Sequence, residues 1–156
     1  MDTTAPVEEA GEAAFIADLR ARGLRATPQR VVLHRILRGI HGHVTAEELL
    51  EKATSQLPSV SLPTIYAALA LLEDMGHVQR VSALGGTAIY DTRQTRHHHV
   101  VCRVCGNVWD LEAPADTQAA VRAAEAAGFA SLSAQVTVQG VCAACTARAV
   151  EAAATA

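Results

Sequence analysis

Aromatic residues are scarce in this chain of 156 residues. It has one tryptophan, two tyrosines and two phenylalanines, so any core must be built mainly from alanine, valine, leucine and isoleucine. Such side chains fill only thin cores, and thin cores in small domains gain stability from a bound metal or from a partner chain. The length suits one ordinary domain or two small ones.

The chain also lacks a long apolar run. No segment approaches the roughly 18 consecutive apolar residues of a membrane-spanning helix. No basic segment precedes an apolar stretch near the first residue, as it would in a secretory signal. We therefore expect a cytoplasmic protein, in a reducing compartment where cysteines stay available as thiolates.

Positive charge is not in excess, but it is unevenly distributed. The formal net charge is −3, with 13 lysines and arginines against 16 acids. Ten of the 13 cations lie in residues 1–96, and the segment from Arg20 to Arg38 contains six arginines and no acid. A solvated helix face would explain part of this cluster, but six cations without counter-charges repel one another. The cluster favours a polyanionic partner such as a nucleic acid.

The four cysteines form two Cys-x-x-Cys pairs, Cys102 with Cys105 and Cys142 with Cys145, separated by 36 residues. Each such turn brings two thiolates to one point, and zinc takes four soft ligands at about 2.3 Å in a tetrahedron. Two disulfides, or one redox-active pair, are the alternatives. A disulfide framework is typical of small secreted chains, and nothing here is secretory. We favour a closed structural zinc site.

Three histidines, residues 97–99, directly precede the first cysteine turn. On a strand, residues i and i+2 point to the same face about 6.6 Å apart, so His97 and His99 can converge on one ion while His98 points away. A run of surface histidines is the alternative. A remnant of an affinity tag would lie at a terminus, and these residues lie in the interior of the sequence.

The N-terminal half has the pattern of several short helices followed by a hairpin. We expect a loose arm over residues 1–11 and a helix from about Phe15 to Gly23. A second helix begins with Thr27 as N-cap and Pro28 in the first helical position. Two further helices begin at a capping box over residues 45–48 and at residues 61–64.

Strands over residues 78–81 and 88–90 flank Gly85-Gly86, which predicts a hairpin. Helices followed by such a hairpin are typical of a winged helix-turn-helix. In that design the helix at 61–75 would enter the major groove and the hairpin would lie over the DNA backbone.

The C-terminal half predicts a small α/β domain. We expect strands over 97–102, 107–111 and 132–140, a helix over 115–127, the two cysteine turns, and a short alanine-rich tail. An open strand edge there would be a natural dimer seam. The fold class is therefore α+β, with a winged-helix DNA-binding domain (1–91), a hinge (92–96) and a metal-binding dimerisation domain (97–156).

These motifs resemble the ferric uptake regulator (Fur) family over nearly the whole chain. The resemblance is carried by Arg25-Ala-Thr-Pro-Gln-Arg30, Ser61-Leu-Pro-Thr-Ile-Tyr66, His97-His-His-Val-Val-Cys-Arg-Val-Cys105 and Gly140-Val-Cys-Ala-Ala-Cys145. Members are dimeric, metal-dependent transcriptional repressors that bind operator DNA. The resemblance implies that this chain is a homodimeric repressor whose four cysteines hold structural Zn²⁺.

The resemblance also implies a regulatory metal site at the hinge. By position, its ligands would be His43, Asp91, His97, His99 and Asp110. Nitrogen and oxygen ligands suit Fe²⁺ or Mn²⁺ as the regulatory ion. Taken singly, His43 could be a loop histidine, Asp91 could pair with Arg93, and Asp110 could cap a turn.

Five residues are candidates for DNA contact. Arg25 and Arg30 belong to the basic cluster, and we expect them to contact phosphates. Ser61, Thr64 and Tyr66 lie at the start of the expected recognition helix. The resemblance makes Tyr66 a DNA contact, although a core tyrosine is the alternative.

Both carboxylates of the implied hinge site are aspartate, as in the peroxide-sensing (PerR-like) subgroup, whereas iron-sensing relatives more often carry glutamate. The resemblance therefore favours a peroxide-responsive repressor of the oxidative stress response over a plain iron-responsive one. In that subgroup peroxide oxidises histidine ligands, which map to His43 and His97.

Two other classes of function are weaker. A metalloenzyme would need an open coordination position and a nearby general base, and the sequence offers ligands without such a base. An interaction module would explain the cysteines but would leave two histidines and two aspartates without a role. We therefore do not expect an enzyme.

Overall fold

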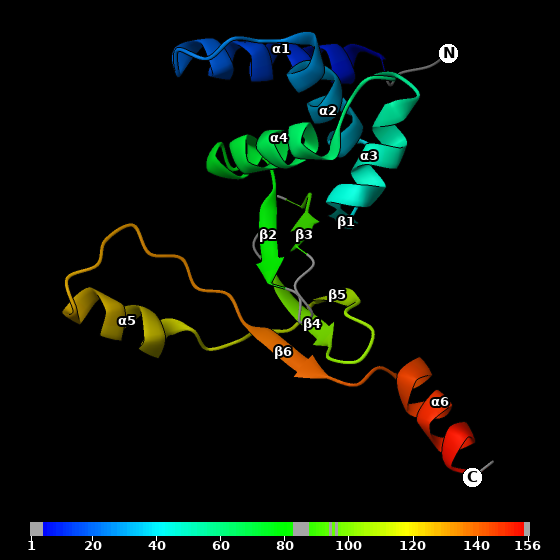
Figure 1. Ribbon diagram of the computed structural model, residues 1–156. Helices are drawn as coiled ribbons and strands as arrows, with labels where there is room; N and C mark the ends of the chain where they lie inside the picture. Colours follow the sequence, from blue (N-terminus) through cyan, green and yellow to red (C-terminus); the bar gives the residue numbers. More distant parts are fainter. Residues whose placement is uncertain (1–4, 83–87, 94, 96, 155–156) are drawn as a thin grey trace. The chain divides into compact units, whose positions relative to one another are not determined.

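The computed structural model of the chain describes residues 5–82, 88–93, 95 and 97–154. The chain divides into two compact units, the first containing Met1–Val81 and Ala88–Gln94 and the second consisting mainly of Thr95–Ala156. Figure 1 labels the helices and strands of both units. In the described part of the chain, no helix is both long and apolar enough to cross a membrane.

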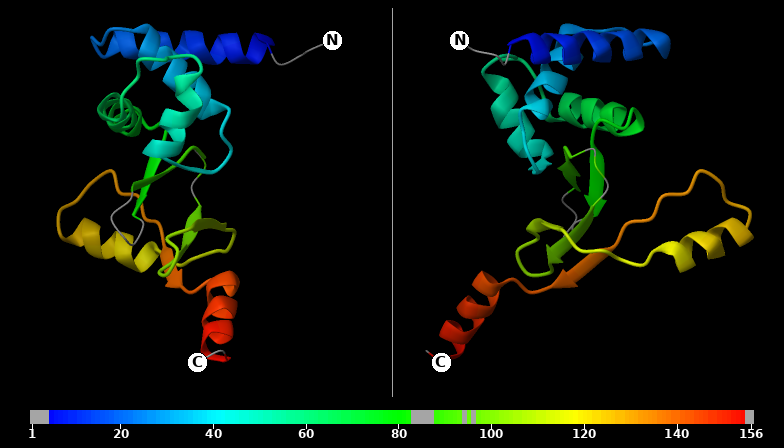
Figure 2. Two further views of the ribbon diagram at one scale, coloured as in Figure 1. Left: turned by 45° about the vertical axis from the view of Figure 1, so that its right-hand side comes forward. Right: turned by 180° about the vertical axis from the view of Figure 1, so that it is seen from behind.

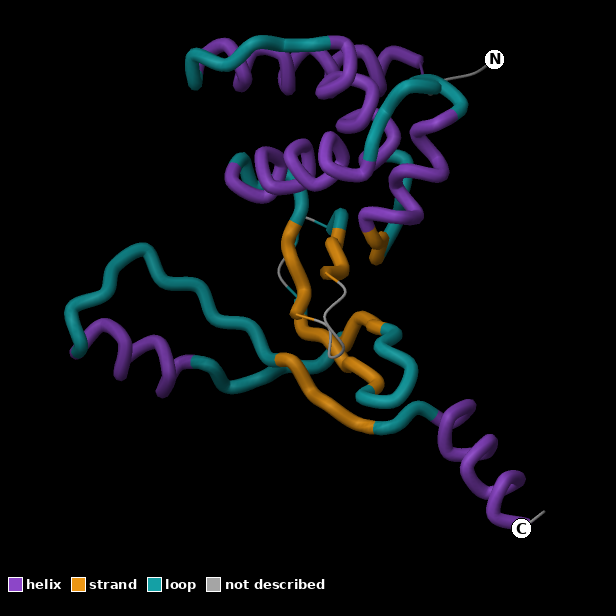
Figure 3. Tube along the Cα trace, viewed as in Figure 1, coloured by secondary structure: helices purple, strands orange, loops and turns teal. Residues whose placement is uncertain are grey.

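The described part of the first unit contains four helices and three strands (Figure 3). They are α1 (Ala5–Ala21), α2 (Pro28–Arg38), β1 (His43–Thr45), α3 (Ala46–Thr54), α4 (Leu62–Asp74), β2 (Gln79–Ser82) and β3 (Ala88–Asp91). The strand order is β1-β3-β2, so the expected hairpin strands gain a third neighbour, β1, that the sequence did not predict. The expected turn at Gly85-Gly86 lies outside the described residues.

The predicted starts of α2, α3 and α4 are confirmed. Pro28 opens α2, and the Thr27 side chain accepts a hydrogen bond from the Arg30 backbone N–H at 3.4 Å. Thr45 and Glu48 form a reciprocal capping box at the start of α3, with bonds of 2.8 and 3.2 Å. Each cap satisfies backbone donors that the first turn of a helix leaves without partners.

The loose arm expected over residues 1–11 is wrong from Ala5 onward, where α1 begins. Alanine and glutamate have high helix propensity, and the helix is fixed further along by Phe15 and Leu19, which are both buried. Its one proline, Pro6, stands in the first turn, where a missing N–H does no harm.

The apolar core lies in the first unit. Its buried cluster includes Leu33 and Leu37 of α2, Leu49 of α3, and Ile65 and Leu69 of α4. These positions recur at helical spacing, so one face of each helix turns inward. The outer face of α4 is left for other contacts.

The second unit contains a three-stranded sheet and two helices in its described part. Its elements are β4 (His98–Cys102), β5 (Val108–Leu111), α5 (Gln118–Ala126), β6 (Thr137–Gly140) and α6 (Ala143–Ala154). The strand order is β5-β4-β6, with β4 antiparallel to β5 and parallel to β6. The strand expected over 132–140 is shorter in the structure, where it begins at Thr137. The expected alanine-rich tail forms helix α6.

The second unit has almost no apolar core of its own. Among its described residues, the buried hydrophobic ones are Val101, Cys102 and Cys145. Helix α5 buries none of its residues, and both α5 and α6 project away from the sheet (Figures 1 and 2). The composition predicted a thin core, and the second unit is where the core is thin.

Candidate metal centres and nucleic-acid interface

The four cysteines come together in the second unit. Their sulfur atoms all lie within 4.8 Å of one another, and Cys105 Sγ and Cys142 Sγ are 3.9 Å apart. A zinc tetrahedron with Zn–S bonds of about 2.3 Å places its sulfurs about 3.8 Å apart. All four cysteines are free thiols, so the disulfide alternative is not supported and the donor set fits Zn²⁺.

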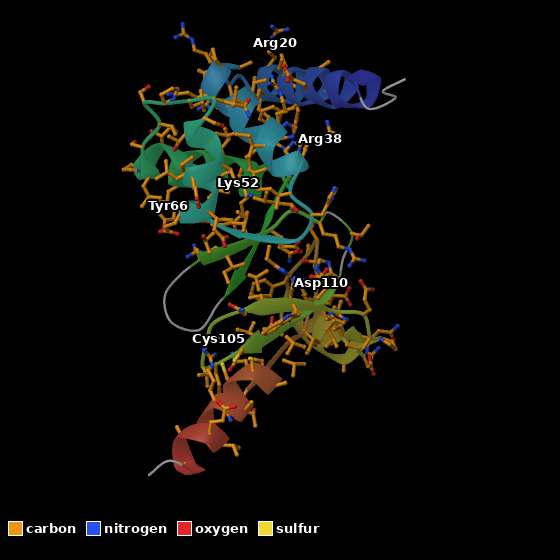
Figure 4. The ribbon with its side chains drawn as sticks, turned by 90° about the vertical axis from the view of Figure 1, so that its right-hand side faces the viewer. Arg20, Arg38, Lys52, Tyr66, Cys105 and Asp110 are labelled. Carbon is orange, nitrogen blue, oxygen red and sulfur yellow. The ribbon has the colours of Figure 1, made fainter. Side chains whose placement is uncertain are left out.

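Strand pairing brings the two cysteine turns together. Parallel pairing of β4 with β6 sets Cys102 beside Gly140, two residues before Cys142. The Cys142 backbone N–H then donates to Cys102 Sγ at 3.4 Å. Gly106 closes the first turn with φ 76°, a left-handed conformation that glycine adopts without strain. Figure 4 shows Cys105 at this turn, near the start of α6.

The thiols differ in their surroundings. Backbone N–H groups of Cys105 and Cys142 lower the pKa of Cys102 to about 6, because they stabilise its thiolate. Burial raises the pKa of Cys145 to about 11. Zinc needs all four sulfurs as thiolates, so zinc binding releases protons and weakens as the pH falls.

Each unit also places a group of the predicted regulatory ligands side by side. In the first unit, His43 of β1 lies directly opposite Asp91 of β3 in antiparallel register. Asp91 Oδ1 also accepts a hydrogen bond from the backbone N–H of Arg93 at 2.9 Å. That contact orients the carboxylate. The sequence suggested that Asp91 could pair with Arg93, and it does so through the backbone of Arg93.

In the second unit, three predicted ligands lie close together: His97 just before β4, His99 in β4 and Asp110 in β5. His99 lies opposite Asp110, His97 Nε2 is 3.2 Å from Asp110 Oδ1, and the rings of His97 and His99 are 4.5 Å apart. His97 Nδ1 contacts the Thr95 carbonyl at 2.8 Å. When Nδ1–H donates to a carbonyl, Nε2 is left as the ring's ligand atom.

Gln135 is a site residue that sequence reasoning missed. Its side-chain nitrogen donates to the His97 carbonyl at 2.6 Å and contacts His99 Nδ1 at 3.1 Å. No motif or spacing marks it, because it follows α5 in a loop far along the chain. His98 takes a structural role, since its Nδ1 accepts from the Val136 backbone N–H at 3.2 Å.

A surface pocket of about 460 Å³ in the first unit contains several predicted DNA-contacting residues. Arg25 and Arg30 line it together with Thr27, Gln29 and Thr64. Arg30 donates to the Arg25 carbonyl at 2.7 Å, which holds its guanidinium near the pocket. The pocket joins the start of α2 to the start of α4.

Acidic side chains compensate part of the positive charge of the arginine cluster. Arg22 pairs with Asp18 and Asp74 at 3.3 and 3.5 Å, and Arg35 pairs with Glu12 at 2.8 Å. These acids lie outside the Arg20–Arg38 segment, so the fold supplies counter-charges that the local sequence lacks.

Tyr66 is 40% exposed on α4, so the core-tyrosine alternative is wrong. Its hydroxyl donates to Glu47 of α3 at 3.2 Å, and Figure 4 shows the side chain projecting from α4. Partial desolvation and this hydrogen bond raise the pKa of Tyr66. Ser61 and Thr64 lie 3.0 Å apart through their hydroxyls at the same helix start.

Known proteins are similar to this chain in sequence and in fold. The peroxide-responsive repressor PerR of Staphylococcus epidermidis is 31% identical over 130 residues, which cover 83% of this chain and 87% of that protein. PerR of Staphylococcus aureus is equally identical over the same length, covering 83% and 88%.

Solved structures give the same result. The ferric uptake regulator of Vibrio cholerae is 26% identical with a TM-score of 0.64, covering 81% of this chain and 98% of that one. The Pseudomonas aeruginosa regulator, solved with manganese, is 26% identical with a TM-score of 0.61, covering 81% and 96%. The Helicobacter pylori regulator, at 17% identity and a TM-score of 0.73 over 89% and 93%, shares the fold.

Residues 21–139 match the Ferric uptake regulator family. With relatives that are 31% identical over most of their length, this match shows that the chain belongs to the ferric uptake regulator family.

Proposed function

We propose that this protein is a metal-dependent DNA-binding repressor, active as a homodimer and responsive to peroxide through Fe²⁺ at a regulatory site. Family membership and the similarity to PerR repressors support this assignment over an enzyme. Residues 1–91 would bind DNA, residues 92–96 would form the hinge, and residues 97–156 would bind metal and dimerise. A regulator that binds operator DNA works in the cytoplasm.

One observation supports the proposal: the predicted regulatory ligands lie in two groups, one in each unit. His43 and Asp91 are paired in the first unit, and His97, His99 and Asp110 meet in the second. An ion that uses ligands of both groups fixes one orientation of the two units. It shifts the protein toward DNA binding only by its differential affinity for that orientation.

The nitrogen and oxygen donors suit Fe²⁺ or Mn²⁺ at this site. The four-sulfur cluster suits Zn²⁺ in a structural role. Since the second unit buries so few apolar side chains, the free energy of zinc binding would supply much of its folding free energy.

An exposed apolar row on the sheet of the second unit supports the homodimer. Trp109, Val100 and Val138 lie side by side across β5, β4 and β6, and Trp109 and Val138 are 43% and 44% exposed. Cross-strand neighbours share one face of a sheet. A second copy of the chain covering that face, or the open edges of β5 and β6, would complete the missing core.

The DNA surface of the proposal runs along α4 and the start of α2. Helix α4 turns Ile65 and Leu69 inward and leaves Ser61, Thr64 and Tyr66 for the major groove. Arg25 and Arg30 line the adjoining pocket, where a backbone phosphate would meet two cations and backbone or hydroxyl donors.

The decisive experiment is DNA binding titrated separately with Fe²⁺, Mn²⁺ and Zn²⁺, before and after dilute peroxide. We expect Fe²⁺ and Mn²⁺ to promote operator binding and only the Fe²⁺ form to lose it after peroxide. Binding that needs no divalent ion would refute the repressor mechanism. Binding that needs Fe²⁺ but survives peroxide would instead identify a plain iron-responsive repressor.

A further inference from the structure

Arg148 contacts the cysteine cluster from outside the cysteine turns. Its guanidinium donates a hydrogen bond to Cys145 Sγ at 3.0 Å. The contact follows from helix geometry, because Cys145 lies in the first turn of α6 (Ala143–Ala154) and Arg148 lies three residues later on the same face. Nothing in the cysteine spacing predicts it.

The two buried sulfurs obtain their hydrogen bonds in different ways. Cys102 lies in a turn that exposes backbone N–H groups, and it accepts one from Cys142 at 3.4 Å. The second turn runs directly into α6, so the following N–H groups enter the helix, as when Thr146 N–H donates to the Cys142 carbonyl at 2.9 Å. The Arg148 side chain therefore provides the hydrogen-bond donor for Cys145, whereas a backbone N–H provides it for Cys102.

Charge makes such a donor important. Four thiolates around one Zn²⁺ carry a net charge of about −2. Residues 97–156 contain three cations, at positions 103, 122 and 148, against five acids. Hydrogen bonds that involve a charged donor or acceptor are roughly twice as strong as neutral ones. The Arg148 contact is therefore a charge-assisted bond to a negatively charged cluster in a unit with few cations.

We propose that Arg148 is a positioning residue of the zinc site, holding Cys145 Sγ in place and offsetting the charge of the zinc–thiolate cluster. This inference rests on zinc binding by the four cysteines. Its consequence is slower loss of zinc and slower reaction of Cys145 with electrophiles, which matters for a regulator that meets oxidants at a separate site.

The test compares the full-length variants Arg148→Ala, Arg148→Gln and Arg148→Lys with a matched control, Arg122→Ala. Arg122 belongs to the same unit but contacts Gln118 at 3.5 Å on α5. Zinc affinity is measured by competition with a chromogenic chelator, and thiol reactivity by iodoacetamide labelling with peptide mass spectrometry. Labelling joins sulfur to the acetamide carbon and releases iodide.

We expect Arg148→Ala to bind zinc about 10- to 100-fold more weakly than the wild type, the usual cost of losing a contact to a ligand atom. Labelling of Cys145 should accelerate in this variant, and Arg122→Ala should match the wild type. Partial rescue by Gln would assign the effect to the hydrogen bond, and rescue by Lys without rescue by Gln would assign it to the charge.

Two results separate the possible failures. Equal zinc affinity in the wild type, Arg148→Ala and Arg122→Ala would overturn the role of Arg148, and so would an equal loss in both alanine variants. A wild-type protein that binds no zinc would refute the zinc site itself. Circular dichroism of Arg148→Gln checks that α6 remains helical.

Discussion

His43 and Asp91 lie directly opposite each other on the antiparallel strands β1 and β3. Their side chains therefore project from the same face of the sheet. An imidazole and a carboxylate give a transition metal only part of its coordination shell. The pair would therefore need further ligands to complete the coordination shell of an ion.

Substituting His43 or His99 by alanine should leave a folded dimer whose DNA binding no longer responds to metal. The expected loss is about 5- to 150-fold in affinity at saturating Mn²⁺, the usual range of an allosteric coupling. Fluorescence anisotropy with operator DNA measures it, and His41→Ala is the control because His41 is exposed two residues before His43. Unchanged metal dependence in His99→Ala would mean that the ion binds elsewhere.

Cys102→Ser should release zinc and either unfold the second unit or make the protein monomeric. Few apolar side chains are buried there, and structural zinc supplies about 10–16 kcal/mol of folding free energy in zinc-finger peptides. Zinc content and light scattering after gel filtration measure both effects. A dimer with unchanged melting in the variant would contradict the structural role of the cluster.

Charge reversal at Arg25 or Arg30 should weaken binding to all DNA sequences and reduce the salt dependence of binding. Each lost phosphate contact lowers the slope of log K against log salt by about 1. Arg35→Glu is the control, because Arg35 lies on α2 with Arg30 and already pairs with Glu12 at 2.8 Å. An equal slope change in the control, or a loss confined to one operator base, would show that these arginines do not contact phosphates.

Features set by local chemistry were predictable from the sequence. The N-cap at Thr27, the capping box at Thr45 and the two cysteine turns each depend on residues within four positions of one another. The approach of the His97 and His99 rings also follows from strand periodicity, whereas only the family resemblance pointed to Asp110. In each case the spacing of the residues along the sequence determines which side chains come together.

Features set by contacts between distant segments were not predictable. The contacts of Gln135 with His99, of Glu47 with Tyr66 and of Glu12 with Arg35 join residues 19 to 36 positions apart. The sequence predicted an alanine-rich tail without predicting its helix, because composition alone does not say where a helix begins. The Cys142 carbonyl accepts a hydrogen bond from the Thr146 hydroxyl at 3.1 Å in the first turn of α6.

His34 should make the first unit sensitive to acid. It is buried, stacked on Phe15 with ring centroids 3.9 Å apart. Burial, with further contributions from His77 and Arg38, lowers its pKa from 6.5 to about 4; His77 in turn faces Asp18 at 3.8 Å. The unfolded chain binds a proton near pH 6.5 and the folded chain does not, so this stability is present above pH 6.5 and declines as pH falls toward 4.

The test of this prediction is urea denaturation of the wild type and His34→Gln between pH 7 and pH 4. We expect the difference in unfolding free energy between the two proteins to narrow as the pH falls, because only the wild type loses the His34 contribution. Comparing the two proteins at each pH removes the shared effect of zinc loss. A constant difference would mean that His34 does not titrate as its surroundings require.

The last prediction concerns peroxide. In the Fe²⁺-loaded protein, we expect the ring of His43 or His97 to gain one oxygen atom from peroxide while the other peroxide oxygen leaves as water. The ring supplies both electrons for this reduction, and the bound iron would mediate their transfer without net change. An oxidised imidazole is a poorer ligand, so the protein should leave its operator. Mn²⁺ should support DNA binding without this reaction, because it is less readily oxidised by one electron.

Asp110 should tune this response. Its Oδ1 lies 3.2 Å from His97 Nε2, so the carboxylate sits beside a ring that peroxide is expected to oxidise. Glutamate is one methylene longer and would crowd that space while still offering an oxygen ligand. We therefore expect Asp110→Glu to retain metal-dependent DNA binding and to lose most of its peroxide sensitivity, whereas Asp116→Glu, at an exposed position, should behave like the wild type. Peptide mass spectrometry after dilute peroxide gives the readout, with operator binding measured in parallel. If neither His43 nor His97 of the wild type gains oxygen and DNA binding persists, the protein senses iron and not peroxide.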